Sequence, residues 1–517
     1  MATSFSASPE LDAPVRVGAM TRMSSVPNVK NTAFEAAGTG RRALGWVAPD
    51  VSPNASVLWN LSTLRNRSRQ ATRNDGFAKS PIDKLVSNVV GTGIKPLSRA
   101  ADTSLRAQIQ ELFEQWTDES DADGVLDYYG QQTQATRGWF EGGEAFVRLR
   151  PRFLEDGLTV PLQLQILEPE MCPHQHTTYT ANGNRIKAGI EFDRIGRRVA
   201  YWFHPSRPGD LDDFDRGSLR RVPEHEVIHL FDPLRPGQLR GLPVLTPALT
   251  RLFDANKFDD ATLLRQQLAN MFVAFVTNKD ATDGADSPHP LTGLSASQNT
   301  AKRPLVPLEP GLFQELDPGQ DVKFSEPPAV GEMYPEFMRQ QLMAACVAVG
   351  VPYEVVTGDL RNLNDRIMRV LLAEFRRRIQ AWQHQIIGFQ LCRRVWLAWL
   401  NAAFLAGKLP FPNSYLADPT PFTKVKWMPQ GWAYLHPVQD VEADQKAIRN
   451  GFTSRASVVS EHGEDVEQID QQQKDDNARA DQMGLKHDSD GRVSLKGSTP
   501  EAKDVEDTNT QPQGAQQ

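Results

Sequence analysis

Long runs of apolar residues at helical spacing are the feature that most constrains this chain. Between Asn364 and Ala406 these apolar positions include Ile367, Leu371, Phe375, Ile379, Trp382, Ile386, Val395 and Trp399. The spacing predicts a long amphipathic helix, ended by Gly407 and Pro410. A second helix, of about thirty residues or ~45 Å, is predicted over Thr246–Val276. Two helices of this length are unusual in a compact enzyme. They favour a protomer that completes its structure beside neighbouring copies.

Residues 144–231, which precede both of these helices, have a strand pattern. Leu162, Leu164 and Ile166 alternate with glutamines, which is typical of a half-buried strand. Ile186–Asp193 and Val199–His204 flank Gly196 and predict a hairpin. Val227–Phe231 is a further predicted strand. The sequence therefore indicates an α+β fold with a β-rich middle region.

Shorter elements follow from capping residues and composition. Ser80-Pro81 predicts a helix start, and another helix is predicted from Asp102. A short helix is expected over 335–349, and short strands are expected around Leu305–Phe324. Residues 461–481 carry eight acidic and two basic side chains, and we expect 466–517 to be disordered.

Composition limits the class of protein. Of 517 residues, 39% are apolar, but no apolar run approaches the ~20 residues of a membrane span, and the N-terminus lacks the pattern of a secretory signal. The cysteines are few and scattered, which fits a reducing cytoplasm; they are Cys172, Cys346 and Cys392. The net charge of −7 disfavours tight static binding of DNA, which usually needs a basic face.

The motif most suggestive of catalysis is His225-Glu226-Val227-Ile228-His229, which matches the H-E-x-x-H pattern of zinc peptidases. On a helix the two histidines would share a face and bind zinc, with Glu226 as general base. The run lies between two prolines and is strand-like, however, and residues four apart on a strand are ~13 Å apart. We interpret it as a structural strand and predict no metal site and no cofactor.

Other candidate sites have simpler interpretations. Cys172, His174 and His176 could bind a soft metal, but no second Cys/His pair lies near them, so a surface or inter-subunit loop is favoured. A phosphate-binding G-x-x-x-x-G-K-[ST] loop is absent from the sequence. The basic stretch Arg65–Lys84 is interpreted as a solvated helix face or as inter-subunit ion pairs. The DNA-proximal candidates are Arg361, Asn364, Arg366 and Arg369.

Four segments together resemble the lambda-type family of tailed-bacteriophage portal proteins. They occur in the family's order between Trp46 and Pro412 and are Leu64–Pro96, Gly189–Asp210, Val222–Leu249 and Ala344–Leu360. Asn364–Arg369 departs from the Tyr-Ser-Ser-type run that the family often has there, which indicates a divergent branch. The third segment contains the H-E-x-x-H run and so accounts for that match.

The resemblance implies a portal-type protomer with long stem and wing helices and a β-rich wing and clip region, assembled as a ring of about twelve. The expected regions are a flexible arm (1–52), the helical part of the wing (53–160), the β-rich wing and clip (161–243), a stem helix (244–277), wing strands with a short helix and the tunnel loop (278–363), a long wing helix (364–412), a crown-proximal segment (413–465) and a disordered tail (466–517).

The resemblance also implies a structural role in the virion, at the portal vertex of the capsid, after assembly in the host bacterial cytoplasm. The implied partners are the terminase large subunit, head–tail connector proteins, the major capsid or scaffold protein and double-stranded DNA, with no membrane. Twelve copies would carry a net charge of about −84, which favours a repulsive bore in which DNA slides. Two alternatives remain at this stage: a zinc metallopeptidase using the His225–His229 motif, and a monomeric DNA-binding protein using the stretch from Arg65.

Overall fold

The computed structural model describes residues 47–209, 218–271, 275–278, 320–323, 333–361, 363–412, 414–434, 436–485 and 487. The chain divides into two units, residues 1–52 and residues 53–517, and every element described below belongs to the second. None of the helices in these ranges is long and apolar enough to span a membrane.

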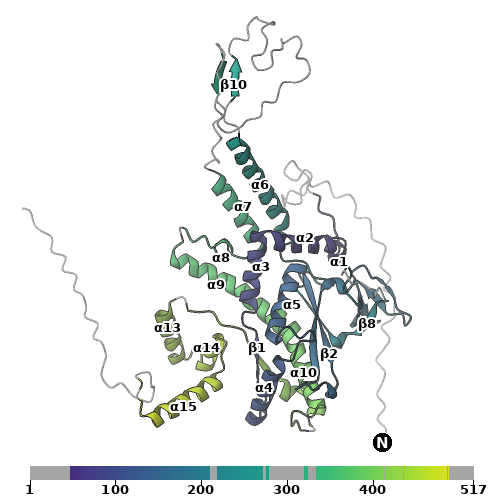
Figure 1. Ribbon diagram of the computed structural model, residues 1–517. Helices are drawn as coiled ribbons and strands as arrows, with labels where there is room; N and C mark the ends of the chain where they lie inside the picture. Colours follow the sequence, from purple (N-terminus) through teal and green to yellow (C-terminus); the bar gives the residue numbers. More distant parts are fainter. Residues whose placement is uncertain are drawn as a thin grey trace, which may run out of the picture. The chain divides into compact units, whose positions relative to one another are not determined.

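The described residues form a mixed α+β fold (Figure 1). The helices are α1 (Pro53–Leu58), α2 (Leu61–Asn74), α3 (Gly76–Val89), α4 (Thr103–Thr117), α5 (Tyr128–Gly142), α6 (Leu249–Met271), α7 (Tyr334–Val349), α8 (Tyr353–Thr357), α9 (Asp365–Trp382), α10 (Arg393–Leu405), α11 (Ser414–Ala417), α12 (Thr420–Thr423), α13 (Pro437–Arg449), α14 (Arg455–Glu461) and α15 (Val466–Met483). The strands are β1 (Lys95–Ser98), β2 (Glu144–Pro151), β3 (Leu162–Leu167), β4 (Thr178–Tyr179), β5 (Arg185–Lys187), β6 (Ile190–Phe192), β7 (Arg198–Phe203), β8 (Arg220–Pro223), β9 (Val227–Phe231), β10 (Phe275–Asn278), β11 (Gln320–Lys323) and β12 (Val425–Met428).

Strand β2 separates two hydrophobic cores. It pairs antiparallel with β3 and β9, so that Val147 lies opposite both Ile166 and Ile228. Successive side chains of a strand point to opposite faces. Val147 accordingly packs in the main core with the helices, and Phe146 packs against the antiparallel sheet β4-β5-β6-β7-β8. The predicted β-rich middle region is therefore confirmed.

The long helix predicted from Asn364 to Ala406 is confirmed. It runs through α9, a π-helical stretch (Gln383–Cys392) and α10 without a break. Asn364 is its N-cap, and its side chain accepts a hydrogen bond of 3.0 Å from the backbone N–H of Arg366. Gly407 adopts a φ of 68° just beyond the end, a conformation that glycine adopts without strain.

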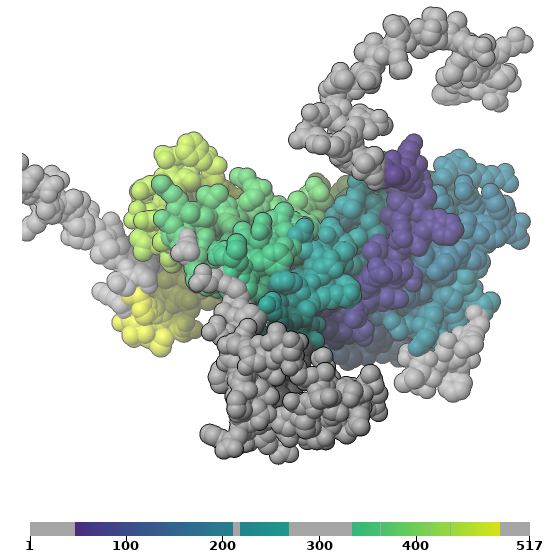
Figure 2. Space-filling model, turned by 90° about the horizontal axis from the view of Figure 1, so that it is seen from above, coloured from purple at the N-terminus to yellow at the C-terminus, as the bar shows by residue number. Residues whose placement is uncertain are grey.

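Helices α6 and α7 pack side by side as an antiparallel pair (Figure 1). Arg251 near the start of α6 donates to Gln341 near the middle of α7 (2.6 Å). Farther along α6, the ring of Phe258 lies 4.9 Å from that of Phe337. Seen from above, the surface of this pair lies beside α2 and α3 (Figure 2), with which the pair is in contact.

The predicted span of the second long helix is wrong at both ends. Residues 244–248 form turns, in which Thr246 N–H donates to Pro243 O, and α6 begins only at Leu249. Beyond Met271, Val276 belongs to β10, which pairs antiparallel with β11. A β-branched residue such as Val276 fits a strand better than a helix.

Three further predictions are corrected. Pro81 lies inside α3, whose N-cap is Asp75 and not Ser80; the Ser80 hydroxyl instead donates to Val356 O (2.7 Å). The acidic segment expected to be disordered contains α15, where Glu467 forms an ion pair with Arg106 (2.6 Å). The expected hairpin strand Ile186–Asp193 is two strands, β5 and β6.

Other predictions concern residues that the structure describes only in part. The predicted helices from Asp102 and over 335–349 are confirmed as α4 and α7. Of the strands expected around Leu305–Phe324, only β11 falls on described residues. Most of the arm over 1–52 and most of the tail beyond 485 lie outside them.

Candidate functional site

The four DNA-proximal candidates lie together, at the junction of α8 with α9. Asn364 caps α9, as described above. Arg361 makes a two-pronged ion pair with Asp359, with both nitrogen–oxygen distances at 2.8 Å. The hydrogen bonds from Arg361 hold the pKa of Asp359 below its usual range. Arg369 forms an ion pair with Asp365 one helical turn away (3.3 Å).

Arg366 differs from the other two arginines of the junction. Within the described part of the chain no ion pair is recorded for its guanidinium, whereas Arg361 and Arg369 each have a carboxylate partner. It lines a groove of about 870 Å³ between α7, α8 and α9. Of the three candidate arginines, Arg366 is therefore the one whose positive charge remains available to an anionic ligand.

The groove beside Arg366 is largely apolar and open to solvent. Its walls include Met343 and Val347 from α7 and Ile367 and Val370 from α9. Val347 is 80% exposed and Val370 is 69% exposed. Apolar side chains gathered in one exposed groove mark a surface that binds another molecule.

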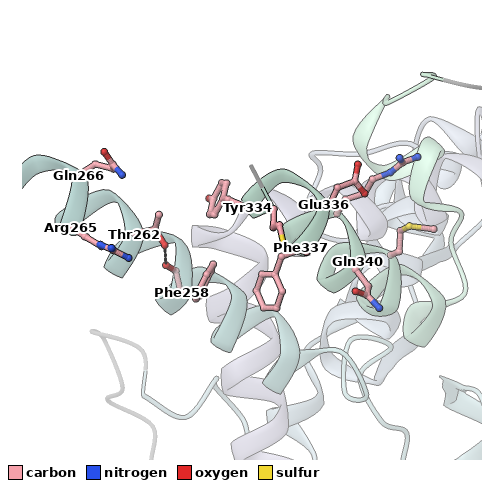
Figure 3. Close-up of a pocket in the computed structure, with 11 residues that line it drawn as sticks. Phe258, Thr262, Arg265, Gln266, Tyr334, Glu336, Phe337 and Gln340 are labelled. Atoms are coloured by element: carbon pink, nitrogen blue, oxygen red, sulfur yellow. Dashed lines mark hydrogen bonds between the residues drawn. The ribbon is translucent and has the colours of Figure 1, made fainter. Parts of the chain in front are cut away.

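A second groove, of about 860 Å³, lies along α6 and α7. Figure 3 shows Phe258 and Phe337 pointing toward one another between the two helices, while Glu336 and Gln340 leave α7 on another side. Met343 lines this groove and the one beside Arg366. The two grooves therefore form one continuous open flank of α7.

The H-E-x-x-H run, interpreted from the sequence as a strand, is a strand only from Val227 onward and begins in a turn. His225 and Glu226 belong to a 3-10 turn, Glu224–Glu226, and His229 lies in β9. The His225 side chain is exposed, whereas that of His229 is buried and bonded through Nε2 to Glu144 (2.8 Å). The three side chains therefore do not converge on one point, and the zinc-peptidase alternative loses its geometric basis.

The Cys172 cluster does not form a metal site among the described residues. No group of three or more His, Cys, Asp or Glu side chains in the described ranges could hold a metal ion. Cys172 is fully buried, its Sγ is 3.7 Å from Gly189 O, and burial raises its pKa to about 11. A thiol in that state is packed as an apolar group. The favoured interpretation of this segment as a surface loop is wrong for Cys172.

The structure reveals a buried charge cluster that the sequence analysis missed. Glu144 of β2 is fully buried and accepts hydrogen bonds from Arg65 of α2, Arg240 (2.7 Å) and the backbone N–H of Gly241 (3.1 Å). Arg240 also donates to Cys172 O (3.0 Å) and so ties the loop after β3 to the cluster. The interpretation of the basic stretch as a solvated helix face or inter-subunit contact is therefore wrong for Arg65, whereas Arg67 and Arg73 are exposed. The DNA-binding alternative loses Arg65 from the stretch that it would use.

Burial and neighbouring charges set the protonation of this cluster. Burial alone raises the pKa of Glu144, but Arg240, Arg65 and His229 more than offset it and hold this pKa well below its usual range. Burial lowers the pKa of His229 to about 4, against the opposing effect of Glu144. His229 is therefore neutral at pH 7, and its Nε2–H donates to the carboxylate, which can only accept. The cluster is a structural ion network that joins α2, β2, β9 and the segment before α6.

No signal in the local sequence pointed to this cluster. Its members are separated by 79 residues (Arg65 to Glu144) and 96 residues (Glu144 to Arg240). Arg65 lies in a basic amphipathic helix and Glu144 lies at the start of a strand. Neither local pattern indicates a buried charge. Only the pairing of β2 with β9 brings His229 beside Glu144.

Comparisons with known proteins give a consistent result. The model of the family described as phage portal protein, lambda family, matches residues 39–383. The chain is 26% identical over 461 residues to the probable portal protein of Halomonas phage phiHAP-1, covering 86% of each sequence. It is 19% identical over 486 residues to portal protein B of Escherichia phage lambda, covering 87% of this chain and 90% of that protein.

Solved structures also match the chain, at low similarity. The neck of an empty gene transfer agent particle is 15% identical, with a TM-score of 0.43, over 77% of this chain and 92% of that one. A HK97 family phage portal protein from Corynebacterium diphtheriae is 12% identical, with a TM-score of 0.27, over 59% of this chain and 83% of that one.

Proposed function

Because this chain belongs to the lambda family of phage portal proteins, we propose that about twelve copies of it form a ring at one capsid vertex of a virion. The ring is the conduit through which DNA enters during packaging and leaves during ejection. It is also the docking site for the terminase, which supplies the energy of ATP hydrolysis, and for the head–tail connector. The role of the chain is structural, and its own residues carry out no catalytic step.

The observation that carries this proposal is the open apolar flank of α7 together with α9. Val347, Val370 and Ile367 are all more than half exposed in the single chain. A folded domain rarely leaves so many apolar side chains in one groove without a partner. A ring built from head-to-tail contacts would cover such a flank in every copy.

The elements of the fold correspond to parts of such a ring. We assign α6, within the expected stem region 244–277, to the stem, and α7 beside it. The β-rich region 161–243 contributes to wing and clip, and α9 with α10 crosses the wing. The loop from Tyr353 to Arg366 approaches the channel, and 413–465 lies near the crown.

The charges at the α8–α9 junction suit a conduit in which DNA slides. Strong contacts with phosphates release counterions and would hold the duplex in place. Arg361 and Arg369 are each neutralised by a carboxylate on the same chain. Arg366 then supplies one available positive charge per copy, enough to centre DNA without binding it tightly.

Packaging of DNA tests this proposal. Particles assembled without the chain should contain no nuclease-protected DNA, and supplying the chain should restore it. Arg366→Glu changes the ring charge by about −24 for twelve copies, so we expect a marked fall in the fraction of DNA-filled particles with ring mass unchanged. The readout is nuclease-protected DNA per particle.

The matched control is Arg377→Glu, on an exposed position of the same helix. It makes the same charge change per copy, and we expect packaging to stay within about twofold of the unmodified chain, since charges away from the bore are screened over ~10 Å. Equal effects of the two variants would contradict the placement of Arg366 at the channel. DNA-filled particles formed without the chain would contradict the proposed function itself.

A further inference from the structure

Strand β2 carries a line of arginines beyond the part of it that packs in the second core. Side chains of a strand alternate between its two faces. Val147 points into the main core, and Phe146 points into the core beneath the β4–β8 sheet. The next positions on the face of Phe146 are Arg148 and Arg150, and Arg152 continues the alternation just after the strand ends. These three arginine side chains are half-buried and reach the surface.

Carboxylates of the described residues neutralise these arginines poorly. Within the described ranges their one ion pair is loose, with 3.8 Å between Arg148 and Glu226, which is longer than a hydrogen bond. Arg150 has no ion pair or side-chain hydrogen bond in the same ranges. Arg152 donates from Nε to the neutral amide oxygen of Gln163 (2.8 Å). The line of arginines therefore keeps most of its positive charge.

Arg148 is the most constrained of the three arginines. Its Nε is buried and has no hydrogen-bond partner in the part of the chain that the structure describes. Burial lowers the pKa of Arg148, and the charges of Arg150 and Arg220 lower it further, against the effect of Glu226. A buried donor without an acceptor costs free energy, and an anion among crowded cations stabilises their charged form. Both properties favour a negatively charged ligand at this position.

Two exposed apolar side chains follow the arginines at the tip of the β2–β3 hairpin. Phe153 is 80% exposed and Leu154 is 67% exposed. The turn that presents them is fixed by Asp156, whose carboxylate accepts a hydrogen bond of 2.9 Å from the backbone N–H of Phe153. The phosphates of DNA would pair with arginines but offer nothing apolar to this tip. Arginine and aromatic side chains grouped together are typical of the residues that dominate binding between proteins.

We propose that this surface docks an extended acidic segment of another protein. The docking surface consists of Arg148, Arg150, Arg152, Phe153 and Leu154. Alternate side chains of an extended segment lie ~6.6 Å apart on one face, which is also the spacing of the arginines along β2. The segment therefore carries carboxylates at every second position, each accepting from one arginine, and an apolar residue beyond the last carboxylate. This docking does not depend on the proposed ring.

Binding of a labelled peptide to the purified full chain tests this inference. The probe is a fluorescein-labelled peptide with three glutamates at alternate positions followed by two leucines, and its companion has glutamines in place of the glutamates. Fluorescence anisotropy at low salt should show binding of the acidic peptide and none of its companion. Arg148→Glu/Arg150→Glu should weaken binding by about tenfold or more, because like charges then face each other. Phe153→Ser/Leu154→Ser should weaken it by about threefold or more, because the apolar contact is lost.

The matched control is Arg377→Glu/Arg479→Glu, which makes the same change of net charge at exposed positions on α9 and α15. This variant should bind the acidic peptide as the unmodified chain does. Circular dichroism checks that each variant is folded. If the double variant at Arg148 and Arg150 does not fold, Arg150→Glu alone gives the same test, since Arg150 has no ion pair to lose among the described residues.

Three results would overturn the inference and leave the proposed function standing. The first is no binding of the acidic peptide at about 1 mM, or equal weakening by the control variant. The second is a DNA duplex that binds more tightly than the peptide and is released by Arg148→Glu/Arg150→Glu. The third is peptide binding that appears only when the chain's own acidic run is neutralised by changing to Asn each of Asp210, Asp212, Asp213 and Asp215.

Discussion

Replacing Glu144 by Gln should lower the free energy of unfolding by about 3–5 kcal/mol, the usual cost of removing one partner from a buried ion pair. The substitution keeps the size of the side chain but removes its negative charge. Arg65 and Arg240 would then remain buried side by side without the carboxylate to which both donate. The measurement is the denaturant midpoint of the purified chain, followed by tryptophan fluorescence.

The control for this prediction is Glu224→Gln, which breaks a pair with Arg394 at half-exposed positions. Exposed pairs contribute about 0–1 kcal/mol, so the midpoint should hardly move. A Glu144→Gln chain as stable as the Glu224→Gln chain would show that the buried cluster does not stabilise the fold.

Replacing Trp399 by Ala should destabilise the chain by about 3–5 kcal/mol, the range for deleting a large aromatic side chain from a core. Trp399 is fully buried in an aromatic cluster, with ring centroids 5.0 Å from Phe113 and 5.5 Å from Trp396. These contacts join α10 to α4. The measurement is again the shift in the denaturant midpoint, here followed by far-ultraviolet circular dichroism.

Two variants separate packing from other effects. In the described part of the chain the Trp399 indole N–H has no hydrogen-bond partner, so Trp399→Phe keeps most of the packing and should cost clearly less than Trp399→Ala. Trp59→Ala removes a side chain that is 88% exposed and should stay within about 0.5 kcal/mol. A Trp399→Phe chain as unstable as Trp399→Ala would contradict ring packing as the source of the stability.

Local sequence signals predicted the elements whose ends are set by local chemistry. Asn364 and Gly407 bracket the long helix because an amide side chain can cap a helix and glycine tolerates a positive φ. The alternation at Leu162, Leu164 and Ile166 predicted β3 because one face of that strand is buried. In the same way, strand propensity at Val227–Phe231 correctly outweighed the H-E-x-x-H pattern.

The predictions that failed depended on distant partners or, for the start of α3, on a competing cap nearby. The acidic composition after Asp465 predicts disorder, yet α15 forms with Glu467 paired to Arg106, 361 residues earlier in the chain. Asp75 and not Ser80 caps α3, because the turn after α2 already leaves Asp75 in an extended conformation with its side chain accepting from Phe77 N–H (2.8 Å). The buried cluster around Glu144 is assembled only when β2, β9 and α2 come together.

The sequence predicted which residues make up the candidate site, and the structure shows which of their side chains have charge partners. The sequence placed Arg361, Asn364, Arg366 and Arg369 at one junction. It could not distinguish Arg366 from the two arginines with carboxylate partners. That distinction depends on where the side chains of Asp359 and Asp365 point, which spacing alone does not determine.

The central claim is that this chain assembles into a closed ring, and the most direct test is the mass of the purified full chain by light scattering, with electron-microscope images of the same sample. At 57.6 kDa per chain, twelve copies give about 690 kDa, and the images should show rings with a central hole. A single species of one-chain mass at every concentration, with no rings in the images, would contradict the claim.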